Sequence, residues 1–187
     1  MVNLAQYSQN GYTISNGTFV GTTIDDTPVA NTLTDAEIRR EIQAQVAARN
    51  LPAINSDALY FVFTPPGVIV TDRNGADSGI NFAGYHDFAS EASFAYSVIP
   101  FASADELTIT ASHELAEAVT DPEPTGSSLG WYDEQNGEIG DIPVSMYYAG
   151  MITESGYVDH LQGPDGSRYA VQKVWSNYDS RPVAFAE

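Results

Sequence analysis

The chain has 187 residues, with 25 acidic and 7 basic side chains, a formal net charge of −18, and no cysteine. The shortage of Lys and Arg argues against nucleic acid or an anionic membrane as a partner, because both are bound by clusters of basic side chains. Without cysteine there are no disulfides or thiolate ligands, so any transition-metal site must use carboxylates and the three histidines His86, His113 and His160.

The first predicted helix follows a polar, Gly-containing stretch. Residues 1–33 are expected to form one or two short strands or an ordered arm. Thr34 with Glu37 three positions later is a capping box, which predicts a helix that runs to about residue 50 and ends before Leu51-Pro52. Its buried stripe is expected to contain Ile38, Ile42 and Val46.

Three strands are predicted between the two main helices. Residues 58–64 are apolar almost throughout and rich in aromatic and β-branched side chains, which predicts a central strand closed by Pro65-Pro66-Gly67. Residues 68–70 are a candidate continuation of this pairing. Residues 79–88 and 94–101 are predicted to be two further strands.

The segment from Ser103 to Asp121 is predicted to be the helix that carries the chemistry. Ser103 and Glu106 form a second capping box, and Asp121-Pro122 ends the helix. His113 and Glu117 are four residues apart and share one face, with Glu114 about 100° further round. The opposite side is expected to anchor the helix in a core through Leu107, Ala111, Leu115 and Ala118.

An imidazole and a carboxylate one turn apart can hold one metal ion, and the neighbouring Glu114 can take a proton from water on that ion. This is the logic of the HExxH metalloprotease helix, with Glu117 in place of the second histidine. HExxE alone is a weak motif, because a solvated helix face with a histidine on it would have the same sequence.

The C-terminal part is predicted to be rich in loops. Residues 131–141 contain four carboxylates and two glycines, and short strands are expected at 146–151, 157–161 and 168–175. We predict one α+β domain over residues 1–187, in which the half 1–122 holds the sheet and active helix and the half 123–187 is loop-rich, with a cleft between them. The acidic loop also allows a calcium site, because it offers the hard oxygen ligands Asp133, Glu134, Asn136 and Glu138.

An ordered set of motifs across roughly residues 80–180 resembles the phosphate-induced protein (EXORDIUM-like) family and its bacterial relatives, which look like secreted zincin-type proteins. The motifs are Gly84-Tyr85-His86, residues 112–122, Gly130-Trp131-Tyr132, Glu138-Ile139-Gly140-Asp141, and residues 171–177. The resemblance implies a zincin-like metalloprotease fold. Pro143 stands where the family pattern leads us to expect cysteine, so any disulfide that the family implies is absent. In zincins the strand ahead of the active helix is typically an edge strand, so we expect residues 94–99 to form an edge to which a peptide substrate can add.

A catalytic zinc needs three protein ligands and an open position for water. His113 and Glu117 supply two of them. By resemblance and position, the third is expected from the loop of residues 138–141, with Asp141 favoured and Glu138 as its rival. His86 is the alternative third ligand, and a strand histidine satisfied by a hydrogen bond is the competing interpretation.

Other residues are candidates for supporting roles. Glu114 is the predicted general base. Asp121 is a ligand, a residue that orients His113, or simply the end of the helix, and we favour the structural interpretations. The donor for the oxyanion stays open among Tyr157 and His160, or Tyr147 and Tyr148.

We therefore predict a secreted, extracellular zinc-dependent endopeptidase that acts on a peptide or protein substrate as a monomer, with Zn²⁺ as cofactor and Ca²⁺ as a second candidate ion. No leader opens the chain, so a secreted protein would be the mature form. The alternative is a non-catalytic extracellular metal-binding protein on a zincin scaffold, because plant members of the resembled family are associated with growth and cell-wall responses. A third interpretation is a calcium-dependent binding module.

Overall fold

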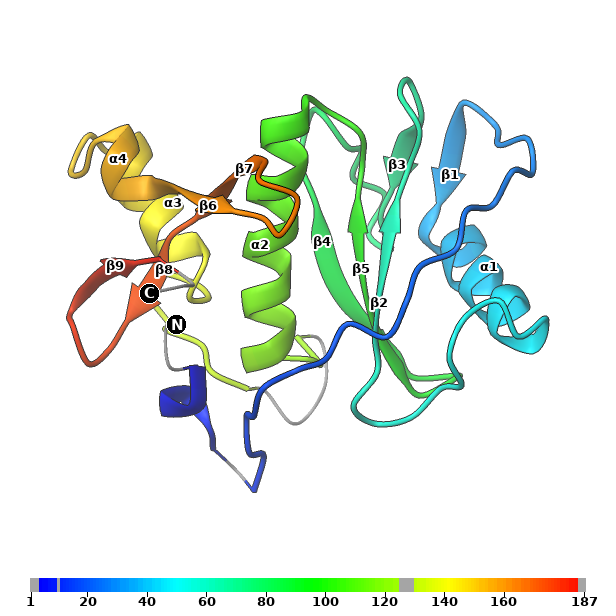
Figure 1. Ribbon diagram of the computed structural model, residues 1–187, viewed down its shortest axis with the longest axis horizontal. Helices are drawn as coiled ribbons and strands as arrows, with labels where there is room; N and C mark the ends of the chain where they lie inside the picture. Colours follow the sequence, from blue (N-terminus) through cyan, green and yellow to red (C-terminus); the bar gives the residue numbers. More distant parts are fainter. Residues whose placement is uncertain (1–3, 10, 125–129, 185–187) are drawn as a thin grey trace. The chain divides into compact units, whose positions relative to one another are not determined.

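The computed structural model describes residues 4–9, 11–124 and 130–184 (Figure 1). The chain is mixed α+β, as predicted, with small sheets and four α-helices in the described part. It divides into two units, one of residues 1–15 with 103–187 and one of residues 16–102. None of the helices in the described ranges combines the length and the apolar character that crossing a membrane requires.

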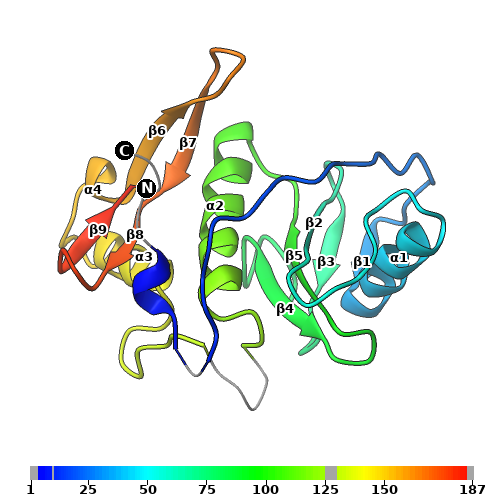
Figure 2. The same ribbon diagram turned by 60° about the horizontal axis from the view of Figure 1, so that its bottom comes forward.

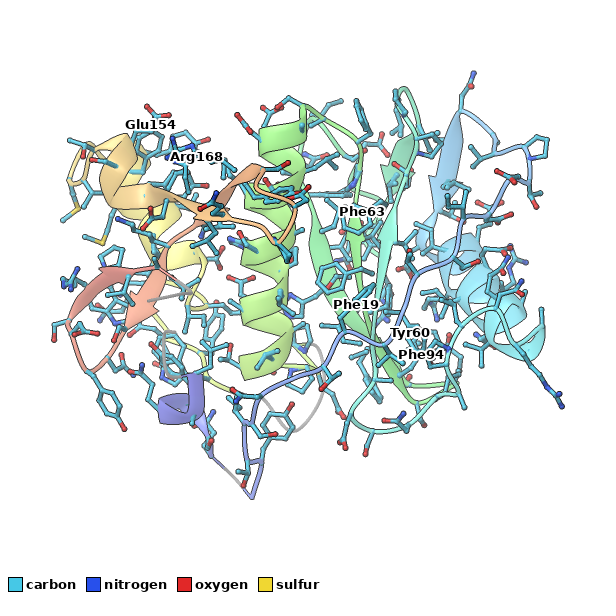
Figure 3. All side chains as sticks on the ribbon, viewed as in Figure 1. Phe19, Tyr60, Phe63, Phe94, Glu154 and Arg168 are labelled. Carbon is cyan, nitrogen blue, oxygen red and sulfur yellow. The ribbon has the colours of Figure 1, made fainter. Side chains whose placement is uncertain are left out.

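The unit of residues 16–102 is a small sheet with one helix. Its elements are β1 (Thr32–Thr34), α1 (Asp35–Ala47), β2 (Leu59–Phe63), β3 (Ile69–Thr71), β4 (Tyr85–Ala89) and β5 (Phe94–Ile99). The main sheet has the order β2-β5-β4, with β2 parallel and β4 antiparallel to β5, and β1 pairs with β3 in a separate parallel ladder. The core of this unit includes Ile38 and Ile42 of α1, together with Tyr60 and Phe94, whose rings meet edge to face (Figure 3).

A buried carboxylate ties α1 to this sheet. The predicted capping box is present, because the side chains of Thr34 and Glu37 each accept from the other residue's backbone N–H. Asp35, the first residue of α1, accepts hydrogen bonds from the hydroxyls of Tyr85 (3.0 Å) and Tyr96 (2.5 Å) and forms an ion pair with Arg39 at 2.9 Å. Burial, and then the Asp35 carboxylate, raise the pKa of both tyrosines, so they stay donors.

The prediction of an edge strand ahead of the active helix is wrong. β5 is the middle strand of its sheet, and β2, predicted to be central, lies at an edge. Non-local pairing decides strand order, and an apolar run cannot show which neighbours will flank it. The β5 backbone is therefore already paired on both sides. The predicted strand 79–88 is also shorter, since only Tyr85–Ala89 forms β4.

The other unit is organised around α2 (Ala104–Thr120). Its remaining elements are the 3₁₀ turn η1 (Leu4–Tyr7), α3 (Asp141–Tyr148), α4 (Glu154–Tyr157), β6 (Val158–Gln162), β7 (Arg168–Gln172), β8 (Val174–Ser176) and β9 (Arg181–Val183). β6 pairs with β7 and β8 with β9, both antiparallel, and β7 lies beside α2 (Figures 1 and 2). The buried core here contains Tyr7, Ile14, Ala116, Ile139 and Val174.

Several local predictions in this unit need correction. The segment predicted as a strand at 146–151 contributes to α3 instead. The predicted last strand 168–175 is split between β7 and β8. Leu115, expected in the core, exposes 42% of its surface. The capping box at Ser103 and the helix end at Asp121 are confirmed.

The single domain over residues 1–187 stays a prediction, but its expected division after residue 122 does not match the two units. The helix that we placed in the N-terminal half groups with residues 130–184, so α2 and the acidic loop belong to the same unit.

Candidate metal centre

Two elements of one unit bring three ligand groups together. α2 places His113 and Glu117 on one face, and the His113 Nε2 atom lies 3.0 Å from Oε2 of Glu117. Asp141, the first residue of α3, places its Oδ1 atom 3.8 Å from the same Nε2. One ligand atom from each of the three residues lies within 4.8 Å of the other two, so the cluster could hold a metal ion.

Backbone amides hold one oxygen of Glu117 and leave the other for the cluster. Oε1 accepts from the N–H groups of Gly140 (3.1 Å) and Asp141 (3.2 Å), at the N-terminus of α3, where the helix dipole favours negative charge. Oε2 is the atom that faces His113. The buried Glu117 side chain is thus pinned in one orientation before any ion arrives.

The two carboxylate oxygens of Asp141 also have separate partners. Its Oδ2 atom accepts from the backbone N–H of Glu138 at 3.2 Å, while Oδ1 faces His113. Gly137, with φ +90°, lies against this carboxylate, and a Cβ there would come within 2.5 Å of Oδ2. The turn before α3 therefore positions Asp141 through its backbone.

A buried amide fixes the other side of the imidazole. The His113 Nδ1 atom lies 3.1 Å from Oε1 of Gln172, the last residue of β7. Gln172 Nε2 donates to the carbonyl oxygen of Gly140 at 2.6 Å, and the Tyr157 hydroxyl donates to the same Oε1 at 3.0 Å. Burial, followed by the neighbouring Tyr148 and Tyr147, raises the pKa of Tyr157 to about 12, so this hydroxyl stays a donor.

The carboxylates control the charge of His113. Burial by itself lowers the pKa of an imidazole, but the adjacent Glu117 outweighs it, with help from Glu114 and Asp141, and the pKa of His113 is raised to about 10. In the metal-free protein His113 is therefore an imidazolium at neutral pH, and Nε2 donates to Glu117. A metal ion must displace that proton.

The other predicted site residues in this unit differ in how they relate to the cluster. Glu114 is on α2 beside His113 with only 4% of its surface exposed, and its role as general base stays a prediction. Glu138 supports Asp141 through its backbone N–H, and it remains the rival ligand by its side chain. Asp121 ends α2, and its Oδ1 accepts from the N–H of Gly130 at 2.8 Å, which fits the structural interpretation. Tyr157 reaches the cluster through Gln172.

Two of the predicted histidines lie outside the His113 cluster. His86 is a buried residue of β4 in the unit of residues 16–102, and its part as an alternative ligand stays a prediction. His160 is exposed on β6, on a shallow pocket that Lys173 and Glu154 also line. Its role as an oxyanion donor stays a prediction.

The calcium interpretation of the acidic loop also stays a prediction. Asp133 directs its Oδ1 into a turn, where it accepts from the backbone N–H groups of Gln135 and Asn136 and from the Asn136 side chain. Within residues 4–9, 11–124 and 130–184, neither Asp133 nor Glu134 belongs to a cluster of three potential ligands.

Sequence reasoning gave no role to Gln172 or Gly140, although both stand in the quoted motifs. Gln172 has 1% of its surface exposed, in a strand whose last three residues are all buried. A long amide at a buried strand position needs partners, but the burial of this position became visible only in the structure. A Cβ on Gly140 would come within 2.7 Å of both His113 Nδ1 and Glu117 Oε1.

Comparisons with protein-family models, with curated proteins and with solved structures found no match for this chain. The resemblance to the phosphate-induced protein family stays a prediction. A function for the chain therefore has to follow from the His113, Glu117 and Asp141 cluster itself.

Proposed function

We propose that the chain is a secreted zinc-dependent endopeptidase of the zincin type, in which His113, Glu117 and Asp141 hold the metal and Glu114 is the general base. The observation that carries the proposal is the convergence of three ligand atoms within 4.8 Å, each on a side chain whose other polar atom is anchored elsewhere. An accidental acidic cluster has no reason to direct one atom of each side chain to a common point.

The donor set fits zinc. One imidazole nitrogen and two carboxylate oxygens leave a fourth position open, which is the pattern of catalytic zinc sites. Zinc–ligand bonds of about 2.0–2.2 Å in a tetrahedron separate the ligand atoms by roughly 3.3–3.6 Å. The Nε2 atom of His113 lies 3.0 Å from Glu117 and 3.8 Å from Asp141, so these two separations are close to the range that zinc requires.

Zinc at this position would supply Lewis acidity, which lowers the pKa of a coordinated water and polarises a peptide carbonyl. Glu114 would accept the proton of the attacking water at a carboxylate oxygen and pass it to the leaving amine. Its burial suits a base that must not share its proton with bulk solvent. His113 would keep Nδ1–H bonded to Gln172 throughout, which leaves Nε2 as the donor to the metal.

Two anionic ligands weaken the Lewis acidity in this site. The charges of Glu117 and Asp141 would cancel that of Zn²⁺, so a bound water ionises less readily than in a site built from histidines. We therefore expect the enzyme to hydrolyse peptides at a modest rate, with a pH optimum above neutral.

One observation favours the alternative of a non-catalytic extracellular metal-binding protein. β5 is paired with both β2 and β4, so the strand ahead of the active helix has no open edge for a peptide. A substrate would need another element for main-chain pairing. The metal site itself is common to both interpretations, and Glu114 separates them.

The deciding experiment compares wild type with Glu114→Gln and with Glu41→Gln, an exposed residue of α1, as the control. Zinc content and hydrolysis of an unstructured protein substrate are measured in the same samples. Glu114→Gln should keep zinc and fold but lose about 10²–10⁴-fold in kcat/KM, because the amide cannot accept a proton. A wild type that binds zinc but cleaves no member of a broad peptide library would establish the alternative.

A further inference from the structure

Gln172 contacts several parts of the metal cluster without being one of the proposed ligands. Its side chain meets His113 on α2, the Gly140 carbonyl ahead of α3, and Tyr157 at the end of α4. Its backbone N–H donates to the Ser112 hydroxyl at 2.9 Å, next to the ligand histidine. The residue is almost fully buried.

The chemistry of these partners leaves one orientation for the amide. A carbonyl oxygen can only accept, so the 2.6 Å contact to Gly140 must be made by the Nε2 amide hydrogens of Gln172. The amide oxygen is then on the side of His113, where it accepts from the Tyr157 hydroxyl as well. Flipping the amide would place two acceptors against each other at Gly140, whereas the Tyr157 hydroxyl can donate or accept and so does not decide the orientation.

The orientation of the amide in turn decides which nitrogen of the His113 imidazole must carry a hydrogen. Opposite an acceptor oxygen, Nδ1 of His113 must carry a hydrogen. When a metal ion displaces the Nε2 proton of the imidazolium, the single remaining N–H is at Nδ1 and the lone pair is at Nε2, the atom that faces Glu117 and Asp141. Partners of this kind on the far nitrogen orient metal-bound histidines and raise their basicity.

We propose that Gln172 is a positioning residue of the metal site: with its amide orientation fixed by Gly140, it keeps a hydrogen on Nδ1 of His113 and so directs Nε2 at the metal. Only the metal in this inference rests on the proposed function. The hydrogen bond between His113 and Gln172 exists in the metal-free protein, and it is tested there separately.

The test uses Gln172→Met, which keeps the size of the side chain but removes its acceptor and donor. The control is Gln162→Met, an exposed glutamine on the paired strand β6. Nitrogen-15 NMR of the metal-free protein should show a slowly exchanging Nδ1–H of His113 in wild type and in Gln162→Met, and its loss in Gln172→Met. Competition with a chromophoric chelator should show zinc affinity lowered about 10–100-fold in Gln172→Met alone.

A second variant covers the case in which Gln172→Met does not fold. Gln172→Glu keeps an oxygen opposite Nδ1, so it should retain both the Nδ1–H signal and zinc binding, although it cannot donate to Gly140. Loss of the signal in Gln172→Glu, or wild-type zinc affinity and wild-type exchange in Gln172→Met, would overturn the inference. A wild type with the Nδ1–H signal but no zinc would overturn the proposed function and leave the orienting bond established.

Discussion

Gly140→Ala tests the metal cluster with a single methyl group. Gly140 lies before α3 with φ −80° and ψ −36°, which alanine adopts without strain, so the backbone does not oppose the substitution. The added Cβ would meet Glu117 Oε1 and His113 Nδ1, both at 2.7 Å, and His113 Cε1 at 2.9 Å. The added methyl group would therefore displace His113 and Glu117, the two proposed ligands on α2, from the groups that hold them.

The size of the effect follows from these distances. Ordinary contact begins near 3.4 Å, so both ligand side chains or the α3 loop must move by about 0.7 Å. Metal sites tolerate deviations of only about 0.2 Å in ligand distance. We expect zinc affinity to fall at least 100-fold, equivalent to about 2.7 kcal/mol. Overpacking of the buried site should also cost about 1–3 kcal/mol in the metal-free protein.

The assay is chelator competition for zinc, with thermal unfolding of the metal-free and zinc-loaded forms. Gly17→Ala is the control, because a Cβ at Gly17 meets nothing within 4 Å. Zinc should raise the Tm of wild type and of Gly17→Ala, and raise that of Gly140→Ala far less. If Gly140→Ala binds zinc as tightly as wild type, the cluster of His113 and Glu117 is not the metal site.

Three further outcomes are expected. Asp141→Asn should weaken zinc binding at least tenfold more than Glu138→Gln in chelator competition, because Asp141 directs an oxygen at His113 while the Glu138 backbone only supports it; equal losses would favour the rival ligand. Zinc affinity should rise about tenfold per pH unit from pH 7 toward 10, since the metal displaces the His113 proton, whose pKa the neighbouring carboxylates raise to about 10, and a flat calorimetric profile would contradict this. Tyr96→Phe removes one donor to buried Asp35 and should lower the free energy of unfolding by about 1–3 kcal/mol, measured by denaturant titration, with zinc binding unchanged.

The helices and the ligand spacing were predictable because their signals are local. Each capping box joins residues three apart, so Thr34 and Ser103 mark their helix starts in the sequence itself. The His113 and Glu117 pair follows from helical periodicity in the same way. The choice of Asp141 over Glu138 as third ligand stays a prediction, and the turn before α3, which directs Asp141 Oδ1 toward His113, supports it.

The strand order and the supporting residues depend on contacts far apart in the chain. Nothing within residues 94–99 reveals that both flanks of β5 are paired, because its partners come from other segments. The aromatic composition of residues 146–151 favoured a strand, but Pro143 in the first turn is compatible with a helix start, and α3 forms there. Gln172 is 59 residues from His113, and only the packing of β7 along α2 joins them.

In the free protein the Nε2 proton of His113 lies where the proposed metal ion would bind. With His113 protonated and Glu117 and Asp141 ionised, the cluster carries one net negative charge, and exchange of the proton for Zn²⁺ would make it neutral. The His113 pKa is raised from 6.5 to about 10, so the ion pair stabilises the metal-free fold fully below pH 6.5 and is lost as the pH rises toward 10. Mild acid should therefore remove zinc by protonating His113 while the pair with Glu117 keeps the site assembled.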